Sequence, residues 1–347
     1  MVDTTGIGTK TFFWFVLASF SVFFAEVLSG SFLFPFFDII GYLVLIPLYG
    51  AHAVVLMTLV VRWGKRSFFG LFSAGLLFGL YEAYITKDLF YPPDGRSPLF
   101  FLEVDWLQVS FLVLFWHMFM AFIVPVLLAM VTLTTSGDVS PWLPGPVRAL
   151  LSDRRRTVLA MFAFLVWAGA FMGGNADPIE GPLAAASGGT IIYCLAWLWR
   201  RRTGGSLKVG QLLPNKRGLY LLIAFMVIWC YIVLGGAFGS EGLPGITGHM
   251  VMIGVYALCL TLIVLNLNGP GESGTEGPKV ELPALKPKIG LLMVLALTAS
   301  ISVSSLTGIG KVVIIVSYIA GSVLGLVCLV AAVISAVKNA MAYGVSN

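Results

Sequence analysis

The feature that most constrains this chain is a series of ten apolar segments, each long enough to cross a lipid bilayer. A hydrocarbon core about 30 Å thick requires about 20 apolar residues in helical conformation. The segments lie at 11–29, 39–61, 68–86, 107–134, 157–173, 182–199, 218–240, 248–267, 289–306 and 313–337. Membrane strands would alternate polar and apolar positions, whereas these segments are apolar throughout. The sequence therefore predicts an all-α, polytopic helical membrane protein.

The composition excludes a soluble fold. Hydrophobic residues make up 59% of the 347 residues and charged residues 11%, and the mean hydropathy is +0.96. A soluble domain carries roughly a quarter charged residues, so this chain cannot cover its surface with groups that water solvates. The partner that these values imply is the lipid bilayer.

The basic residues predict the orientation in the membrane. With the N-terminus in the cytoplasm, 18 of the 21 Lys and Arg residues fall in cytoplasmic loops, and Lys87, Arg96 and Lys311 fall outside. Short loops follow the positive-inside rule. We therefore expect a multi-pass protein of the cell membrane with both termini in the cytoplasm. This topology explains the net charge of +5, which requires no nucleic-acid partner.

Composition divides the chain into four parts. Residues 1–134 contain the first four segments, 135–267 the next four, and 289–347 the last two with a short C-terminal tail. Residues 268–288 are rich in Gly, Pro and Glu, and have almost no apolar surface to bury, which predicts a flexible cytoplasmic linker. The ionisable residues inside apolar segments are concentrated in 1–134, where we expect a functional site.

Five ionisable side chains lie within the first four segments. A charged group at membrane depth costs about 2.5–3.5 kcal/mol, so each requires a partner, a hydrated cavity or a functional role. The five are Glu26, Asp38, His52, Glu82 and His117. In the predicted orientation the three acids lie near the outer ends of their helices and the two His residues lie deeper. They are candidates for an ion- or proton-binding site.

Helical periodicity places these side chains on faces that carry small residues. At 100° per residue, Gly75, Gly79 and Glu82 share one face of segment 68–86. Small residues mark contacts between membrane helices, so Glu82 is predicted to face another helix rather than lipid. The same reasoning groups Ser19 with Glu26 and Gly30, Asp38 with Gly41, Tyr49 and His52, and Ser110 with His117 and Ala121. We expect the four polar faces to converge.

Segment 68–86 resembles one helix of the intramembrane CAAX-protease-like family. That family has two consecutive Glu residues, with an Arg four residues after the second, and two further helices that each carry a His. Glu82 matches the first Glu, whereas Ala83 and Lys87 replace the second Glu and the Arg. His117 matches one family His, but Val113 stands where that motif has Phe. The sequence also lacks the Asn or Asp four residues after a His that would complete the other motif.

A wider similarity is to uncharacterised multispan membrane proteins of prokaryotes, and of archaea in particular. It is carried by residues 24–30, 47–50 and 79–87 and covers mainly the first four segments. The resemblance implies a multi-pass membrane protein and no specific activity.

Three functions remain open. The first is a transporter-like permease in which Glu82 and Glu26 bind a proton or cation. In this permease, His117 and His52 relay protons and Asp38 lies at the entrance.

The second function, implied by the CAAX-protease-like resemblance, is a membrane-embedded, metal-dependent hydrolase. There Glu82 activates water, and Glu82, His117 and His52 are the candidate metal-site residues. The third is a membrane scaffold or assembly factor whose polar cluster only holds helices together. The sequence identifies no cofactor, substrate or oligomeric state.

Overall fold

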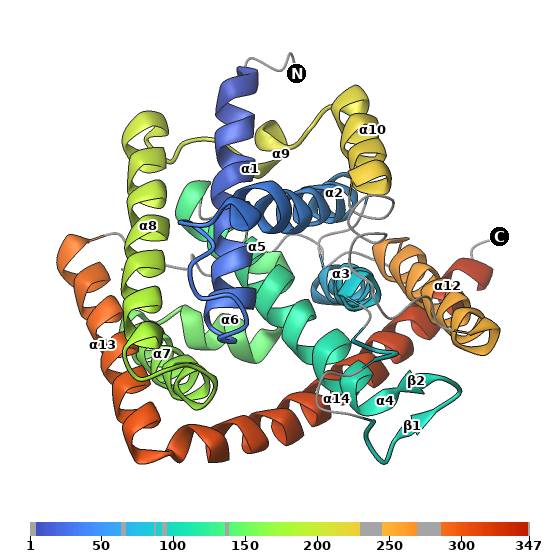
Figure 1. Ribbon diagram of the computed structural model, residues 1–347. Coiled ribbons are helices and arrows are strands. Elements are labelled where there is room, and N and C mark those ends of the chain that lie inside the picture. The colour runs from blue at the N-terminus through green and yellow to red at the C-terminus, as the bar shows by residue number, and fades with distance from the viewer. Residues whose placement is uncertain are drawn as a thin grey trace. The chain divides into compact units, whose positions relative to one another are not determined.

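The residues that the structure describes are mostly helical (Figure 1). The computed structural model describes residues 5–63, 67–86, 88–91, 96–135, 139–229, 245–268 and 286–345. Within these ranges, nine helices are long and apolar enough to cross a membrane. They are Ile7–Val27, Gly41–Arg62, Phe68–Thr86, Trp106–Leu133, Arg154–Asn175, Glu180–Thr203, Ile246–Leu267, Pro287–Thr307 and Ile309–Ala342. The predicted all-α, multispan fold is confirmed.

The remaining predicted segment, 218–240, is described only in its first half. Helix α10 (Lys216–Phe225) covers its beginning, and residues 230–240 lie outside the described residues. Residues 269–285, which form most of the predicted linker, also lie outside them.

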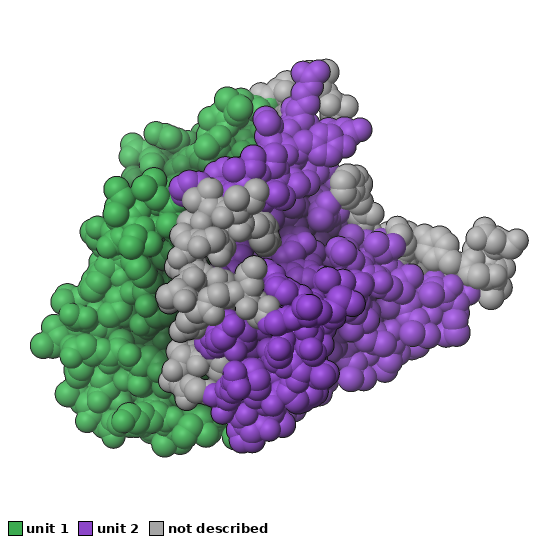
Figure 2. Space-filling model, turned by 45° about the vertical axis from the view of Figure 1, so that its right-hand side comes forward, with its two compact units in different colours: residues 1–50, 124–213, 274–319 green, residues 51–123, 214–273, 320–347 purple. Residues whose placement is uncertain are grey.

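The chain folds into two compact units that alternate along the sequence (Figure 2). Unit 1 comprises residues 1–50, 124–213 and 274–319, and unit 2 comprises residues 51–123, 214–273 and 320–347. The boundaries between them fall within helices α2 (Ile46–Trp63) and α14 (Ile309–Val345), among other places. The division into 1–134, 135–267, 268–288 and 289–347 stays a prediction.

Unit 1 is a bundle of long helices with short connecting elements. Its long helices are α1 (Ile7–Val22), α5 (Val124–Leu133), α7 (Arg154–Asn175), α8 (Glu180–Thr203) and α13 (Pro287–Thr307). Its short elements are η1 (Phe23–Val27), η2 (Gly41–Leu45), η5 (Ser140–Trp142), α6 (Gly145–Leu151) and α9 (Val209–Leu212). Helix α1 packs against α5 and α8, and α13 packs against α7 and α8.

Helices α7 and α13 pack closely because small residues line their contact. A Cβ at Gly169 would lie 2.7 Å from the carbonyl oxygen of Leu297, and one at Gly173 would lie 2.6 Å from that of Ile301. The hydroxyl of Ser304 donates to an α7 carbonyl oxygen at 2.7 Å. Between membrane helices, close backbone approach and interhelical hydrogen bonds replace the hydrophobic driving force of soluble proteins. Small residues therefore stabilise this contact.

Unit 2 is built around helix α3. Its helices are α3 (Phe68–Thr86), α4 (Trp106–Gln108), the π-helix η3 (Val109–Ile123), α10 and α12 (Ile246–Asn268), with the parts of α2 and α14 that belong to it. The antiparallel strands β1 (Phe100–Phe101) and β2 (Val104–Asp105) form a hairpin before α4. Helix α3 packs against both η3 and α12.

Several apolar segments contain π-helix where an α-helix was expected, among them η2 and η3. Each of these two ends just before an α-helix whose second residue is proline, Pro47 in α2 and Pro125 in α5. Proline donates no backbone hydrogen bond and its ring crowds the carbonyl four residues earlier, so the preceding turn is opened. In a π-helix residue i pairs with i+5. The α-helical phase that grouped Ser110 with His117 and Ala121 is therefore wrong.

Replacing Gly173 with alanine tests the close packing of α7 and α13. We expect Gly173→Ala to lower the free energy of unfolding by about 1–3 kcal/mol, because backbone must move to admit the methyl group. The matched control is Gly254→Ala in α12, where none of the described residues beyond its own stretch of helix lies within 4 Å of an added Cβ. The control should be neutral or stabilising, because alanine favours helix. Thermal unfolding of the detergent-solubilised protein measures both, and equal midpoints would contradict the packing described.

Candidate functional site

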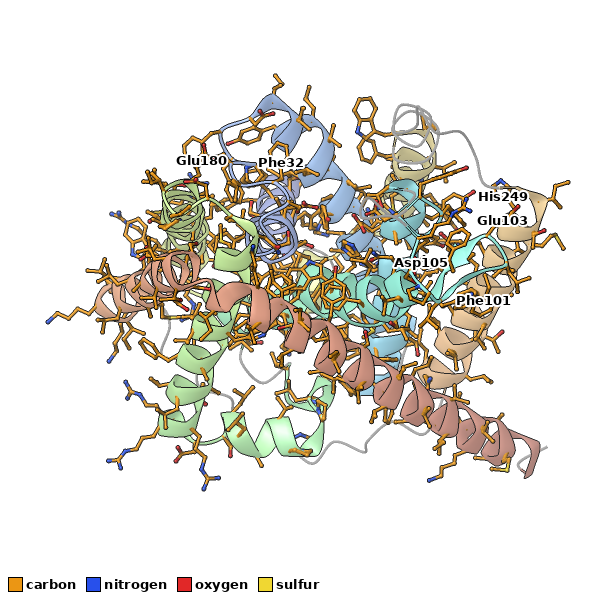
Figure 3. All side chains as sticks on the ribbon, turned by 60° about the horizontal axis from the view of Figure 1, so that its bottom comes forward. Phe32, Phe101, Glu103, Asp105, Glu180 and His249 are labelled. Carbon is orange, nitrogen blue, oxygen red and sulfur yellow. The ribbon has the colours of Figure 1, made fainter. Side chains whose placement is uncertain are left out.

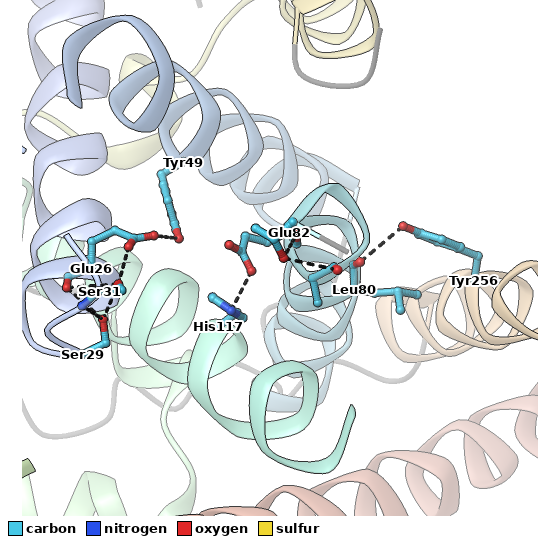
Figure 4. Close-up of polar contacts among 10 residues, drawn as sticks. Glu26, Ser29, Ser31, Tyr49, Leu80, Glu82, His117 and Tyr256 are labelled. Carbon is cyan, nitrogen blue, oxygen red and sulfur yellow. Dashed lines mark hydrogen bonds and ion pairs between the residues drawn. The ribbon is translucent and has the colours of Figure 1, made fainter. Parts of the chain in front are cut away.

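The candidate site centres on Glu82 of α3 and His117 of η3, both in unit 2 (Figure 4). Nε2 of His117 lies 2.6 Å from Oε2 of Glu82. Glu82 is 6% exposed and His117 is 8% exposed. At this distance the two side chains form an ion pair when the imidazole is protonated. The structure therefore brings together two of the five predicted site residues.

Glycines on α3 allow η3 to approach the Glu82 face. A Cβ at Gly79 would lie 2.8 Å from the carbonyl oxygen of Val113, and one at Gly75 would lie 2.7 Å from Cγ of Met118. Both neighbours belong to η3, the helix that carries His117. The prediction that Glu82 shares a face with small residues and faces another helix is confirmed.

Helix α14 also packs closely on η3. A Cβ at Gly325 would lie 2.5 Å from the carbonyl oxygen of Leu114, and one at Gly321 would lie 2.5 Å from Cδ1 of Phe115. The hydroxyl of Ser110 donates to that of α14 residue Ser322 at 3.1 Å. The small residues of α14 therefore pack inside unit 2 and help to fix the helix that carries His117.

His52 lies in unit 2 against aromatic side chains. It is 2% exposed, and its ring centroid lies 5.8 Å from that of Tyr81 and 5.9 Å from that of Phe78. Tyr81 in turn lies 5.1 Å, centroid to centroid, from Tyr256 of α12. Imidazole and phenol groups thus form a row from α2 through α3 to α12.

The residues proposed as a metal site do not form a group that could hold a metal. Among the residues that the structure describes, no group of three or more His, Cys, Asp or Glu side chains is arranged for this. Within this set, His117 lies in direct contact with Glu82.

Glu26 forms a polar cluster in unit 1 (Figure 4). Its carboxylate accepts a hydrogen bond from the Tyr49 hydroxyl and another from Oγ of Ser31, the latter at 2.5 Å. The hydroxyl of Ser29 donates to the Glu26 backbone carbonyl at 2.8 Å. A buried or half-buried carboxylate is costly unless donors replace the water that it loses, and hydroxyl groups supply them here. This cluster could hold a proton or a small cation.

Asp38 is half-buried in the loop between η1 and η2. Its Oδ1 accepts a hydrogen bond from the backbone N–H of Ile40 at 2.7 Å, which is a local turn interaction typical of aspartate. Its role at an entrance stays a prediction. Glu26 and Asp38 belong to unit 1, whereas His52, Glu82 and His117 belong to unit 2. The convergence of all five on one site therefore also stays a prediction.

A polar contact at the N-terminus of α12 was not predicted (Figure 3). Oε2 of Glu103, at the tip of the β1–β2 hairpin, accepts a hydrogen bond from the Gly248 backbone N–H at 2.8 Å. Oη of Tyr84 lies 3.4 Å from Nδ1 of the neighbouring His249. A carboxylate at a helix N-terminus stabilises the unpaired backbone N–H groups there. In the sequence, Glu103 is only an acidic residue in a turn-rich loop. That signal does not identify Gly248, 145 residues away, as its partner.

A double-mutant cycle tests the Glu82–His117 contact. Removing one partner of a buried ion pair costs about 3–5 kcal/mol, because it leaves the other polar group uncompensated. We expect Glu82→Gln and His117→Asn each to destabilise the protein, and the double variant to be destabilised by much less than the sum. A coupling of about 0.5–3 kcal/mol is typical of residues in contact. Unfolding in detergent measures this coupling energy. If the effects of the two single substitutions simply add in the double variant, the side chains do not interact.

Comparison with known proteins places the chain among membrane proteins. A family described as "Uncharacterized membrane protein family" matches residues 15–341. An uncharacterized protein of Archaeoglobus fulgidus is 32% identical over 277 residues, which cover 78% of this chain and 83% of that protein. No solved structure matches. The predicted similarity to uncharacterised archaeal multispan membrane proteins is confirmed.

Proposed function

Since the chain belongs to this uncharacterised family of membrane proteins, we propose a function from its own residues: a permease coupled to proton or cation movement. Glu82 and His117 form its proton-binding pair. The observation that supports this proposal is their 2.6 Å contact among apolar, membrane-spanning helices. Ionisable residues at membrane depth are costly and are most often parts of ion pathways or proton relays.

The pair can exist in states that differ by one proton. With one proton between them, the two groups carry no net charge, either as imidazolium with carboxylate or as neutral imidazole with carboxylic acid. A second proton leaves imidazolium beside a neutral acid, so the ionic attraction that joins α3 to η3 is lost. Proton binding therefore favours a conformation with a weaker α3–η3 contact, and a permease requires two such conformations.

The other predicted residues have supporting roles in this proposal. His52 relays protons, since it is buried and lies beside the Tyr81 ring. Glu26, with its hydroxyl donors, is a second ion-binding group, and Asp38 lies at the entrance. We place the protein in the cell membrane with cytoplasmic termini, because its basic residues follow the positive-inside rule. Its transported partner is a small ion or small molecule.

The metal-dependent hydrolase has less support. Catalytic zinc sites use three protein ligands, and the described residues contain no group of that kind. A scaffold would use the Glu82–His117 pair for stability alone, which separates it experimentally from a permease.

Proton flux in proteoliposomes tests the proposal. Vesicles that contain a pH-sensitive dye are given a pH gradient in either direction, and a panel of ions and small solutes is added outside. We expect at least one solute to move protons with the wild type, and Glu82→Gln to abolish this movement while the protein stays folded. The control Glu180→Gln changes an exposed acid in the first turn of α8 and should retain it.

Two results would contradict a permease. Unchanged coupled flux in Glu82→Gln would leave the pair with a structural role. Turnover of a substrate that is independent of any gradient and is lost on chelation would favour the hydrolase.

A further inference from the structure

Unit 1 contains an apolar groove between α1, α5, α7, α8 and α13. It offers a ligand about 130 Å³ of space. This is less than the roughly 300–1,000 Å³ that is typical of small-molecule sites, so the groove suits a narrow ligand. Its lining is almost entirely aromatic and aliphatic, including Phe20, Phe23, Met161, Ile192 and Leu297. Such a lining offers a ligand apolar contact and almost no hydrogen bonds.

On α1 and η1 the groove is lined by Phe20, Phe23 and Phe24, far from the N-terminal end of α1, and on the other helices it extends toward one end. It is reached by Met161 of α7, Ala196 of α8 and Gly290 of α13. Each of these residues is within about two turns of the helix end that carries basic residues, which is the predicted cytoplasmic end. At this depth in the bilayer the available apolar ligand is a lipid hydrocarbon chain.

Basic residues lie at that end of helices α7, α8 and α13. Helix α7 begins with three Arg residues, α8 ends with three, and two Lys residues flank the start of α13. All are exposed: Arg154, Arg155, Arg156, Arg200, Arg201, Arg202, Lys286 and Lys288. The acid beside them, Asp153, caps α7 by accepting a hydrogen bond from the Arg156 backbone N–H. The local charge is strongly positive.

A direct contact joins the basic residues to the groove. Nε of Arg200 donates to the backbone carbonyl oxygen of Thr132 at 2.8 Å, and Thr132 lines the groove. The guanidinium of Arg201 lies 5.3 Å from the ring centroid of Trp197, and that of Arg202 lies 5.5 Å from that of Phe12. The Arg200 contact places one cationic group beside the groove, and the other two hold cationic groups against rings near the same end of α8.

We propose that this groove binds an anionic phospholipid of the cytoplasmic leaflet. One hydrocarbon chain fills the groove, and the phosphate pairs with the basic residues at the ends of α7, α8 and α13. Guanidinium groups bind phosphate through paired hydrogen bonds, and basic pockets between helices on the cytoplasmic side suit acidic head groups. The inference concerns unit 1 and does not depend on proton coupling by Glu82 and His117.

Native mass spectrometry of the detergent-purified full chain tests head-group selectivity. The protein is titrated with dioleoyl phosphatidylglycerol or with dioleoyl phosphatidylcholine, which share the same chains. We expect one molecule of the anionic lipid to bind at least tenfold more tightly than the neutral lipid. Because each basic residue near the surface contributes about a fivefold preference, Arg201→Gln with Arg202→Gln should remove most of this selectivity. The control, Lys216→Gln with Arg217→Gln at the start of α10, should leave the selectivity for the anionic lipid unchanged.

A substitution inside the groove tests whether the groove binds the hydrocarbon chain of the lipid. A Cβ at Gly189 would lie 3.5 Å from Val294 and 3.9 Å from Phe23, so Gly189→Leu extends into the groove without a backbone clash. We expect Gly189→Leu to abolish tight binding of the anionic lipid, whereas the control Gly254→Leu on α12 retains it. Equal binding of the two lipids by the wild type, or tight anionic-lipid binding that survives both the groove and the arginine variants, would overturn the proposal. If Gly189→Leu does not fold, the arginine variants decide the outcome.

Discussion

A carboxylate and an imidazole in an apolar interior stabilise each other only while they remain within hydrogen-bond distance. In unit 2 that distance is set by backbone packing, since glycines of α3 let η3 come close enough for His117 to reach Glu82. Helix α14 holds η3 through its own glycines. A small change in how these helices pack would separate the pair and leave two polar groups in an apolar environment. The pair and the packing around it therefore depend on each other.

In the proposed permease, this mutual dependence couples proton binding to conformation. A proton that neutralises Glu82 removes the attraction, and the packing that the attraction favoured then loses part of its stabilisation. The same coupling operates in reverse, because a conformation that separates α3 from η3 changes the affinity for the proton. A permease requires this reciprocity between ion binding and conformation.

Much of the architecture could be predicted from the sequence because the bilayer imposes simple rules. Apolar length alone identified the nine spans that the described residues contain. The face of α3 that carries Gly75, Gly79 and Glu82 was also predictable, since α3 is a regular α-helix and small residues mark its contact.

The pairings could not be predicted. Periodicity shows which way Glu82 points but not which of several polar helices it meets. The π-helical turns of η3 changed the phase of His117, and their sequence signal, Pro125, follows the segment that it affects. The partner of Glu26, Tyr49, lies 23 residues away across a turn that no local pattern specifies.

Infrared difference spectroscopy between acidic and neutral pH tests the central claim most directly, because it detects protonation of a single buried carboxyl group. We predict a carboxylic acid band in the wild type that disappears in Glu82→Gln and is shifted, in frequency or in the pH of its appearance, in His117→Asn. A band that persists in Glu82→Gln, or that is identical in the wild type and His117→Asn, would contradict a proton-binding pair formed by Glu82 and His117.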